Sequence, residues 1–220
     1  MRDNLVHIGE VIVHGILFDP KNSEALRSMD VEGLYQAVPR LFDLLDERGV
    51  PYVLVGGIAM LAYVEGRNTQ DIDLIVAPAD LEKVPEITIE DRNPEFARGR
   101  LGELQVDFLL TDSKLFDEVR RNHVTTRRFV ERDVPCATVE GLLLTKLFAL
   151  PSLYRQGQFA KVRTYEKDIA DLIEGFHPNI NHLLETLADH LLPSDVAEVR
   201  RIVAEIEQRI AQQSQRFGKS

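Results

Sequence analysis

The sequence predicts an α+β fold, in which a mixed β-sheet core is followed by a C-terminal helical bundle. Two observations support this prediction. Up to about residue 137, short apolar segments with strand character alternate with segments whose apolar residues recur at helical spacing. Beyond it the pattern is mostly helical. We therefore expect three parts: an N-terminal segment at 1–30 with no assigned role, a core at 31–137 and a helical domain at 138–220.

The core is expected to begin with a helix at 31–48, where apolar residues recur at helical spacing and Gly49 and Pro51 end the run, although Pro39 lies inside it. The elements expected next are a strand at 52–55 stopped by a glycine pair, a short helix at 58–65, strands at 71–78 and 104–111, and further strands at 127–130 and 134–139. In the helical domain, the expected helices cover 139–153 and about 161–175, 179–191 and 194–213. The last carries one apolar stripe.

Composition limits the class of protein. The chain has 220 residues, 44% of them hydrophobic, which is enough to form a core. A net charge of −10 argues against a protein that coats nucleic acid, because such binding depends on many lysine and arginine contacts. Local basic clusters exist, among them Arg92, Arg98 and Arg100, so the protein could still bind a polyphosphate, although we interpret each single arginine as a solvated loop charge.

The chain shows no sign of a secretory signal or a membrane span, because charged residues and histidines interrupt its apolar N-terminal stretch. We therefore expect a cytoplasmic protein with no membrane partner. The single cysteine, Cys136, lies in an apolar run and is expected to be a small buried residue rather than a nucleophile. The histidines have no metal-ligand spacing, and no P-loop or GxSxG motif is present.

Three aspartates form the candidate metal site. Asp71 and Asp73 are two residues apart on a predicted strand, so their side chains lie on one face while Ile72 points to the other. Asp107 repeats this arrangement on the next predicted strand and could reach the same site. Clustered carboxylates repel one another unless a cation lies between them, and oxygen ligands suit Mg²⁺ or Mn²⁺. Taken alone, Asp71 and Asp73 are also compatible with a surface pair on an edge strand.

A glycine pair precedes this site. Gly56 and Gly57 lie between a strand and a helix, where a phosphate can approach backbone N–H groups unhindered by a Cβ atom, although such pairs are often plain turns. Thirteen residues then separate Gly57 from the strand that carries Asp71. Arg67 and Thr69, just before that strand, could hold phosphate oxygens.

These residues, in the order VGG, DIDL and VDF, resemble the signature of the polymerase-beta-like nucleotidyltransferase superfamily over about residues 50–175. The closest resemblance is to AbiEii-type toxins, which belong to toxin-antitoxin and abortive infection systems. In that pattern a lysine and a distant aspartate follow in the helical half, and here they would be Lys146 and Asp168. The resemblance implies an ATP- or other NTP-dependent, magnesium-requiring transferase in which Lys146 holds donor phosphate.

Physical reasoning alone is less specific for these two residues. Lys146 lies among leucines, so its side chain must reach solvent or form an ion pair. Asp168 could simply lie on a solvated helix face. A salt bridge between the two would account for both.

Three functions remain open at this stage. The leading one is transfer of NMP from an NTP to an acceptor hydroxyl on RNA, such as a tRNA end, or on a protein, in which case a cognate antitoxin would be a partner. A second is modification of a small molecule such as an aminoglycoside, which the acidic composition favours. The third is a nucleotide-binding module without turnover. The acceptor, the donor base and the oligomeric state are not predicted.

Overall fold

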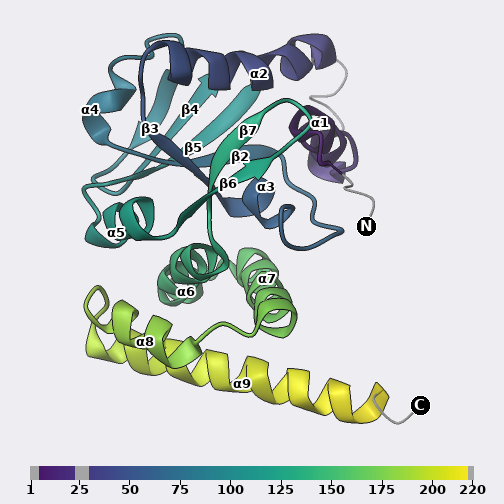
Figure 1. Ribbon diagram of the computed structural model, residues 1–220, viewed down its shortest axis with the longest axis vertical. Coiled ribbons are helices and arrows are strands. Elements are labelled where there is room, and N and C mark those ends of the chain that lie inside the picture. The colour runs from purple at the N-terminus through teal and green to yellow at the C-terminus, as the bar shows by residue number, and fades with distance from the viewer. Residues whose placement is uncertain (1–4, 23–29, 218–220) are drawn as a thin grey trace. The chain divides into compact units, whose positions relative to one another are not determined.

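The computed structural model describes residues 5–22 and 30–217 (Figure 1). The chain divides into two compact units, Met1–Thr138 and Val139–Ser220, which are described separately below. Among the described residues, no helix combines the length and the apolar character that crossing a membrane requires.

The first unit is built on a seven-stranded sheet with the order β3-β4-β5-β2-β1-β7-β6. The strands are β1 (Tyr52–Val55), β2 (Asp71–Val76), β3 (Thr88–Arg92), β4 (Phe96–Leu101), β5 (Leu104–Leu110), β6 (Val124–Arg128) and β7 (Asp133–Ala137). Strand β2 pairs in parallel with β5, and β1 pairs in parallel with β7, while the other neighbours are antiparallel. The mixed sheet predicted from the sequence is therefore confirmed.

The register at the centre of the sheet brings polar residues together. In β2, the side chains of Ile72 and Leu74 are fully buried, whereas the alternate positions Asp71 and Asp73 are half-buried. Across the parallel pair, Asp73 lies opposite Asp107 of β5. The alternation of strand side chains thus places polar groups from two neighbouring strands on one face of the sheet.

The helical segments of the first unit are α1 (Ile8–Leu17), η1 (Pro20–Asn22), α2 (Val31–Glu47), α3 (Gly56–Met60), α4 (Pro78–Leu81) and α5 (Lys114–Asn122). Helix α2 lies along the sheet in Figure 1, and its apolar stripe, which includes Leu34, Val38 and Leu41, is buried. The carboxylate of Asp30 caps it by accepting a hydrogen bond from the Gly33 N–H at 2.9 Å. The helix continues through Pro39.

Helix α1 packs against α2, so the described part of the N-terminal segment belongs to the first unit. It also approaches the chain just before β2. A Cβ atom at Gly15 would lie 2.0 Å from the backbone oxygen of Thr69, so only glycine permits this contact. Residues 23–29, also in that segment, lie outside the described residues.

The structure differs from the sequence prediction in several elements. Strands β3 and β4 and helix α5 were not predicted, and the short helix expected at 58–65 ends at Met60. Arg98 and Arg100 therefore lie on a strand, and the interpretation of them as loop charges is wrong. The strand was missed because FARGRL contains a glycine and two arginines, which weaken its pattern.

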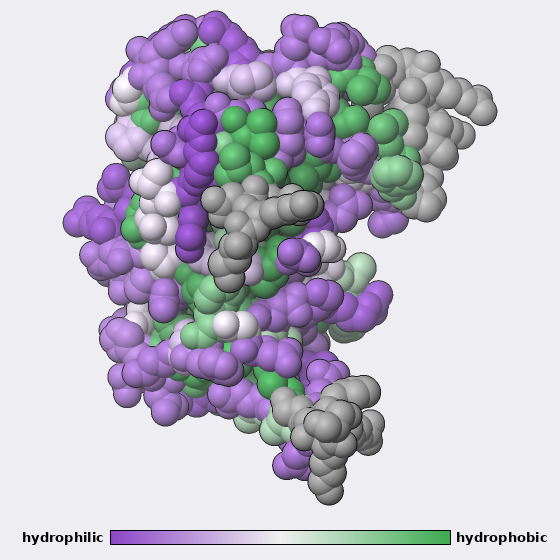
Figure 2. Space-filling model, turned by 45° about the vertical axis from the view of Figure 1, so that its right-hand side comes forward, coloured by the Kyte–Doolittle hydropathy of each residue, from purple (hydrophilic) through white to green (hydrophobic). Residues whose placement is uncertain are grey.

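The second unit is helical, as predicted, and contains α6 (Val139–Arg155), α7 (Phe159–Phe176), α8 (Ile180–Ala188) and α9 (Pro193–Phe217). The apolar stripe of α9 is buried at Val199, Ile202, Val203 and Ile206. The face of the molecule in Figure 2 is covered mainly by hydrophilic residues, with hydrophobic residues in small groups between them.

Candidate active site

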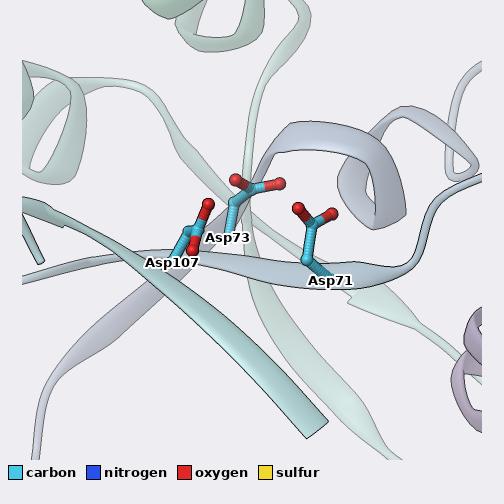
Figure 3. Close-up of side chains that lie close together, drawn as sticks. All are labelled: Asp71, Asp73 and Asp107. Atoms are coloured by element: carbon cyan, nitrogen blue, oxygen red, sulfur yellow. The ribbon is translucent and has the colours of Figure 1, made fainter. Parts of the chain in front are cut away.

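Asp71, Asp73 and Asp107, which we call the acidic cluster, lie on β2 and β5 with their side chains on one side of the sheet (Figure 3). Each contributes a carboxylate oxygen, and these three atoms lie within 4.8 Å of one another. Among residues 5–22 and 30–217, no other three histidine, cysteine or acidic side chains come this close. The surface-pair interpretation of Asp71 and Asp73 therefore does not hold, because β2 is a central strand.

The ligand set of the acidic cluster fits a divalent ion. Oxygen atoms bound to one Mg²⁺ ion at about 2.1 Å lie at most roughly 4.2 Å apart, so little side-chain rotation would bring the three carboxylates into its coordination sphere. All three residues are half-buried, which reduces competition from bulk water. Hard oxygen donors without histidine or cysteine favour Mg²⁺ or Mn²⁺ over zinc.

Arg98 is a neighbour of the acidic cluster that the sequence analysis did not identify. From β4 its Nε and Nη2 atoms donate hydrogen bonds to the two carboxylate oxygens of Asp107, each at 2.8 Å. The hydrogen bond to Asp107 raises the pKa of the Arg98 guanidinium above its ordinary value. Gln105, two residues before Asp107, donates to the same carboxylate at 3.2 Å. Strand alternation could have indicated Gln105, but only the β4–β5 pairing reveals Arg98.

Thr69 holds a member of the acidic cluster. Its hydroxyl donates a hydrogen bond to Asp71 Oδ1 at 2.9 Å, and its side chain is buried. The structure therefore gives Thr69 a positioning role toward Asp71. Arg67, predicted with Thr69 to hold phosphate, donates from Nη1 to the backbone oxygen of Asn68 at 3.3 Å.

The glycine pair is required by close contacts to these same side chains. Gly56 has a positive φ of 65°, and a Cβ atom there would lie 1.8 Å from Asp73 Oδ2. A Cβ atom at Gly57 would lie 2.5 Å from the Thr69 hydroxyl oxygen. The Gly57 N–H also points to Asp73 Oδ2, at 3.4 Å. The pair is therefore more than a plain turn, because its lack of side chains lets Asp73 and Thr69 lie against α3.

In the second unit, Lys146 of α6 and Asp168 of α7 form a buried salt bridge, with 2.9 Å between Nζ and Oδ2. Only 3% and 1% of the two side chains are exposed. The ammonium group also lies over the ring of Tyr165, 4.5 Å from its centroid. The salt bridge suggested by the sequence is thus present, and the interpretation of Asp168 as a solvated residue is wrong.

A polar cleft of about 560 Å³ lies beside the acidic cluster in the first unit. Asp71 forms part of its wall, together with residues of α1, η1, the segment before β2 and the β4–β5 turn. No pattern in the sequence indicates this cleft, because its wall joins segments that are far apart in the chain.

Cys136 offers no rival chemistry. It is fully buried, and burial raises the pKa of its thiol to about 12, so it remains protonated and unreactive.

The sequence matches no protein-family model and no curated protein. Among solved structures, the chain is similar to the solution structure of the antibiotic-resistance factor ANT(2'')-Ia, with 14% identity and a TM-score of 0.51. The match covers 84% of this chain and 97% of the ANT(2'')-Ia chain. A nucleotidyltransferase-like protein from Paracoccidioides brasiliensis covers 78% and 93%, at 16% identity and a TM-score of 0.48. A crystal structure of ANT(2'')-Ia with adenylyl-2''-tobramycin covers 79% and 98%, at 14% identity and a TM-score of 0.48.

The first of these likenesses shows the fold. The chain has the α+β architecture of a nucleotidyltransferase core followed by C-terminal helices.

Proposed function

We propose that the protein is a metal-dependent nucleotidyltransferase, which transfers NMP from an NTP to an acceptor hydroxyl and releases pyrophosphate. The observation that carries this proposal is the acidic cluster, whose three carboxylate oxygens lie within 4.8 Å of one another on this fold. Like-charged groups held this close by two strands call for a cation. A nucleotide-binding module without turnover has no need for three clustered carboxylates, so this alternative explains the acidic cluster less well.

In the proposed reaction, the acceptor oxygen bonds to the α-phosphorus of the NTP. The bond from that phosphorus to the oxygen bridging it to the β-phosphorus breaks, and pyrophosphate leaves with the electron pair. A divalent ion, when bound, would lower the pKa of the attacking hydroxyl and balance charge on the leaving group. Asp71, Asp73 and Asp107 would hold the ion, and Asp107, on the acceptor side, would also assist removal of the hydroxyl proton.

At the donor end, we assign phosphate binding to the backbone of Gly56 and Gly57 and to Arg67; for Lys146, the motif resemblance alone supports the same assignment. Thr69 positions Asp71, one of the proposed metal ligands, through its hydroxyl hydrogen bond. For Lys146 the assignment carries a condition, because its ammonium group already pairs with Asp168. To bind phosphate, the ammonium group would either contact the phosphate while it keeps the salt bridge to Asp168 or break that salt bridge.

For the acceptor, a small molecule is the better-supported choice. The net charge of −10 disfavours an RNA acceptor and favours a neutral or cationic one. ANT(2'')-Ia, whose solution structure shares this overall fold, is an antibiotic-resistance factor. The second candidate is an AbiEii-type toxin that modifies RNA or protein and is neutralised by an antitoxin, and the motif resemblance alone favours it.

The test is a transfer assay with purified protein, Mg²⁺ or Mn²⁺ and each of the four labelled NTPs. Three acceptor sets are compared: aminoglycosides and other small molecules, total cell RNA, and cell protein. We expect transfer to a small molecule, and Asp73→Asn should abolish it because the ion loses a ligand. Asp43→Asn, a control at an exposed carboxylate of α2, should leave transfer unchanged. Transfer that persists in Asp73→Asn would refute the mechanism.

A further inference from the structure

The cleft borders the acidic cluster at Asp71, which lines its wall, whereas Asp73 does not line it. Asp71 and Gln105 face each other across the β2–β5 pair, and both form part of the wall of the cleft. Gly56 and Gly57, at the proposed donor end, lie against Asp73 and are not among the wall residues, although Gly57 also lies against Thr69, which lines the cleft. The cleft therefore meets the acidic cluster at a different carboxylate from the donor turn.

One wall of the cleft is fixed in place by a hydrogen-bond network from the N-terminal segment. Gln70 Nε2 donates to Asp19 Oδ2 at 2.7 Å, and Asn22 Nδ2 donates to Gln70 Oε1 at 3.1 Å and to the Ile16 carbonyl at 3.2 Å. The backbone N–H of Lys21, together with Gln70, lowers the pKa of the Asp19 carboxyl, which keeps this acceptor ionised. These bonds join α1 and η1 to the segment before β2.

The wall chemistry suits a ligand rich in hydroxyl groups. Four amide side chains, which both donate and accept hydrogen bonds, line the cleft: Asn22, Asn68, Gln70 and Gln105. Charges of both signs, from Arg100 and Glu103, lie on the β4–β5 side, and Ile16 is the single large apolar residue among those that line it. A strongly anionic or apolar ligand would find few matching groups there.

The size of the cleft fits a small molecule. Its volume of about 560 Å³ falls within the range of roughly 300–1,000 Å³ that small-molecule sites occupy. This volume is too small to enclose a folded RNA, and the polar walls of the cleft do not suit an apolar peptide side chain.

We propose that this cleft binds the acceptor, a hydroxyl-rich small molecule of carbohydrate type, with one hydroxyl directed at the acidic cluster. This inference rests on the proposed nucleotidyl transfer. It adds that the N-terminal α1–η1 segment, which the motif resemblance does not cover, forms part of the wall of the acceptor site. Asn68 and Glu103, both exposed at the cleft, are the contact residues, and Asn22 and Gln70 fix the wall behind them.

The first experiment measures binding without nucleotide or metal, so it does not depend on turnover. Saturation-transfer NMR is run on the full chain with maltose, glucosamine and the aminoglycoside kanamycin as probes, and with leucinamide as an apolar comparison. We expect a saturation-transfer signal, which reports binding, for at least one hydroxyl-rich probe and no such signal for leucinamide. Asn68→Phe, which fills the cleft from an exposed position, should remove the signal. Gln36→Phe, at an exposed amide on α2, should keep it.

The second experiment uses steady-state kinetics with the best probe as acceptor. In Asn68→Phe, we expect KM for the acceptor to rise by about tenfold or more, with KM for the NTP unchanged. A rise in KM for the NTP instead would mean that the cleft holds the donor nucleoside and would overturn the inference.

The two proposals fail in different ways. Probe binding that no variant alters, or no binding by any hydroxyl-rich probe, overturns the acceptor site. Probe binding that Asn68→Phe removes, combined with no transfer from any NTP, keeps the cleft as a carbohydrate site and overturns the nucleotidyl transfer.

Discussion

If the acidic cluster binds a metal ion as proposed, we expect Arg98 to compete with that ion for Asp107, so removal of Arg98 should tighten metal binding. In the structure its guanidinium engages both Asp107 oxygens at 2.8 Å, so an ion that takes either oxygen must displace a hydrogen bond. Half of the Arg98 side chain is exposed, which limits the strength of the pair. Exposed ion pairs are worth about 0.2–1 kcal/mol, and a bidentate pair falls at the upper end. About 1 kcal/mol corresponds to roughly a fivefold change in affinity.

The variant is Arg98→Met, which keeps most of the aliphatic stem and removes the charge. Binding of Mn²⁺ is measured by electron paramagnetic resonance of the free ion, without nucleotide, and we expect the dissociation constant to fall about fivefold. The matched control is Arg128→Met, because Arg128 pairs with Asp133 across β6 and β7 as Arg98 pairs with Asp107 across β4 and β5. Unchanged or weaker Mn²⁺ binding in Arg98→Met, or equal tightening in the control, would refute this reasoning.

Three other predictions follow from the geometry. Gly56→Ala should lower the melting temperature and weaken Mn²⁺ binding, because its Cβ atom would lie 1.8 Å from a carboxylate oxygen of the acidic cluster. Gly66→Ala, also at positive φ but with nothing within 4 Å, should lower stability only, by about 1–2 kcal/mol. In urea unfolding, Lys146→Met should cost about 3–5 kcal/mol because it leaves a buried carboxylate without its ammonium partner, and adding Asp168→Leu should restore most of the loss. A cost below about 1 kcal/mol would contradict this. The pKa of the Cys136 thiol, raised to about 12 by burial, predicts that iodoacetamide labels the folded protein at pH 8.5 far more slowly than the urea-unfolded one. Equal labelling rates in the two states would contradict the burial of Cys136. Because the folded state holds the thiol proton more tightly than the unfolded state does, the free energy of unfolding should decrease as the pH rises above the ordinary thiol pKa of about 8.5.

The parts of the site that depend on local pattern could be predicted from the sequence. The period of two along a strand is enough to put Asp71 and Asp73 on one face, and Asp107 follows from the same pattern on the next apolar strand. Helical spacing likewise indicated α2 and the helices of the second unit. These features depend on neighbouring residues in the chain.

The parts that depend on pairing between distant segments could not be predicted. Arg98 reaches Asp107 only because β4 pairs with β5 in one register, and nothing within FARGRL specifies that register. The wall of the cleft depends on Asp19 and Gln70, which are 51 residues apart. The sequence indicated Thr69 as a candidate phosphate contact, which stays a prediction, but it did not indicate the hydrogen bond to Asp71, since a hydroxyl can donate to a phosphate or to a carboxylate.

The contact between α3 and the residues before and within β2 also restricts how the sequence can change over time. A side chain at position 57 would occupy the space that Thr69 fills, so only one of these two positions can carry a side chain. At position 56, any substitution meets Asp73 as well as an unfavourable backbone conformation. Among homologous sequences, a side chain at 57 should therefore occur only where position 69 is glycine, whereas position 56 should remain glycine wherever position 73 is an acid.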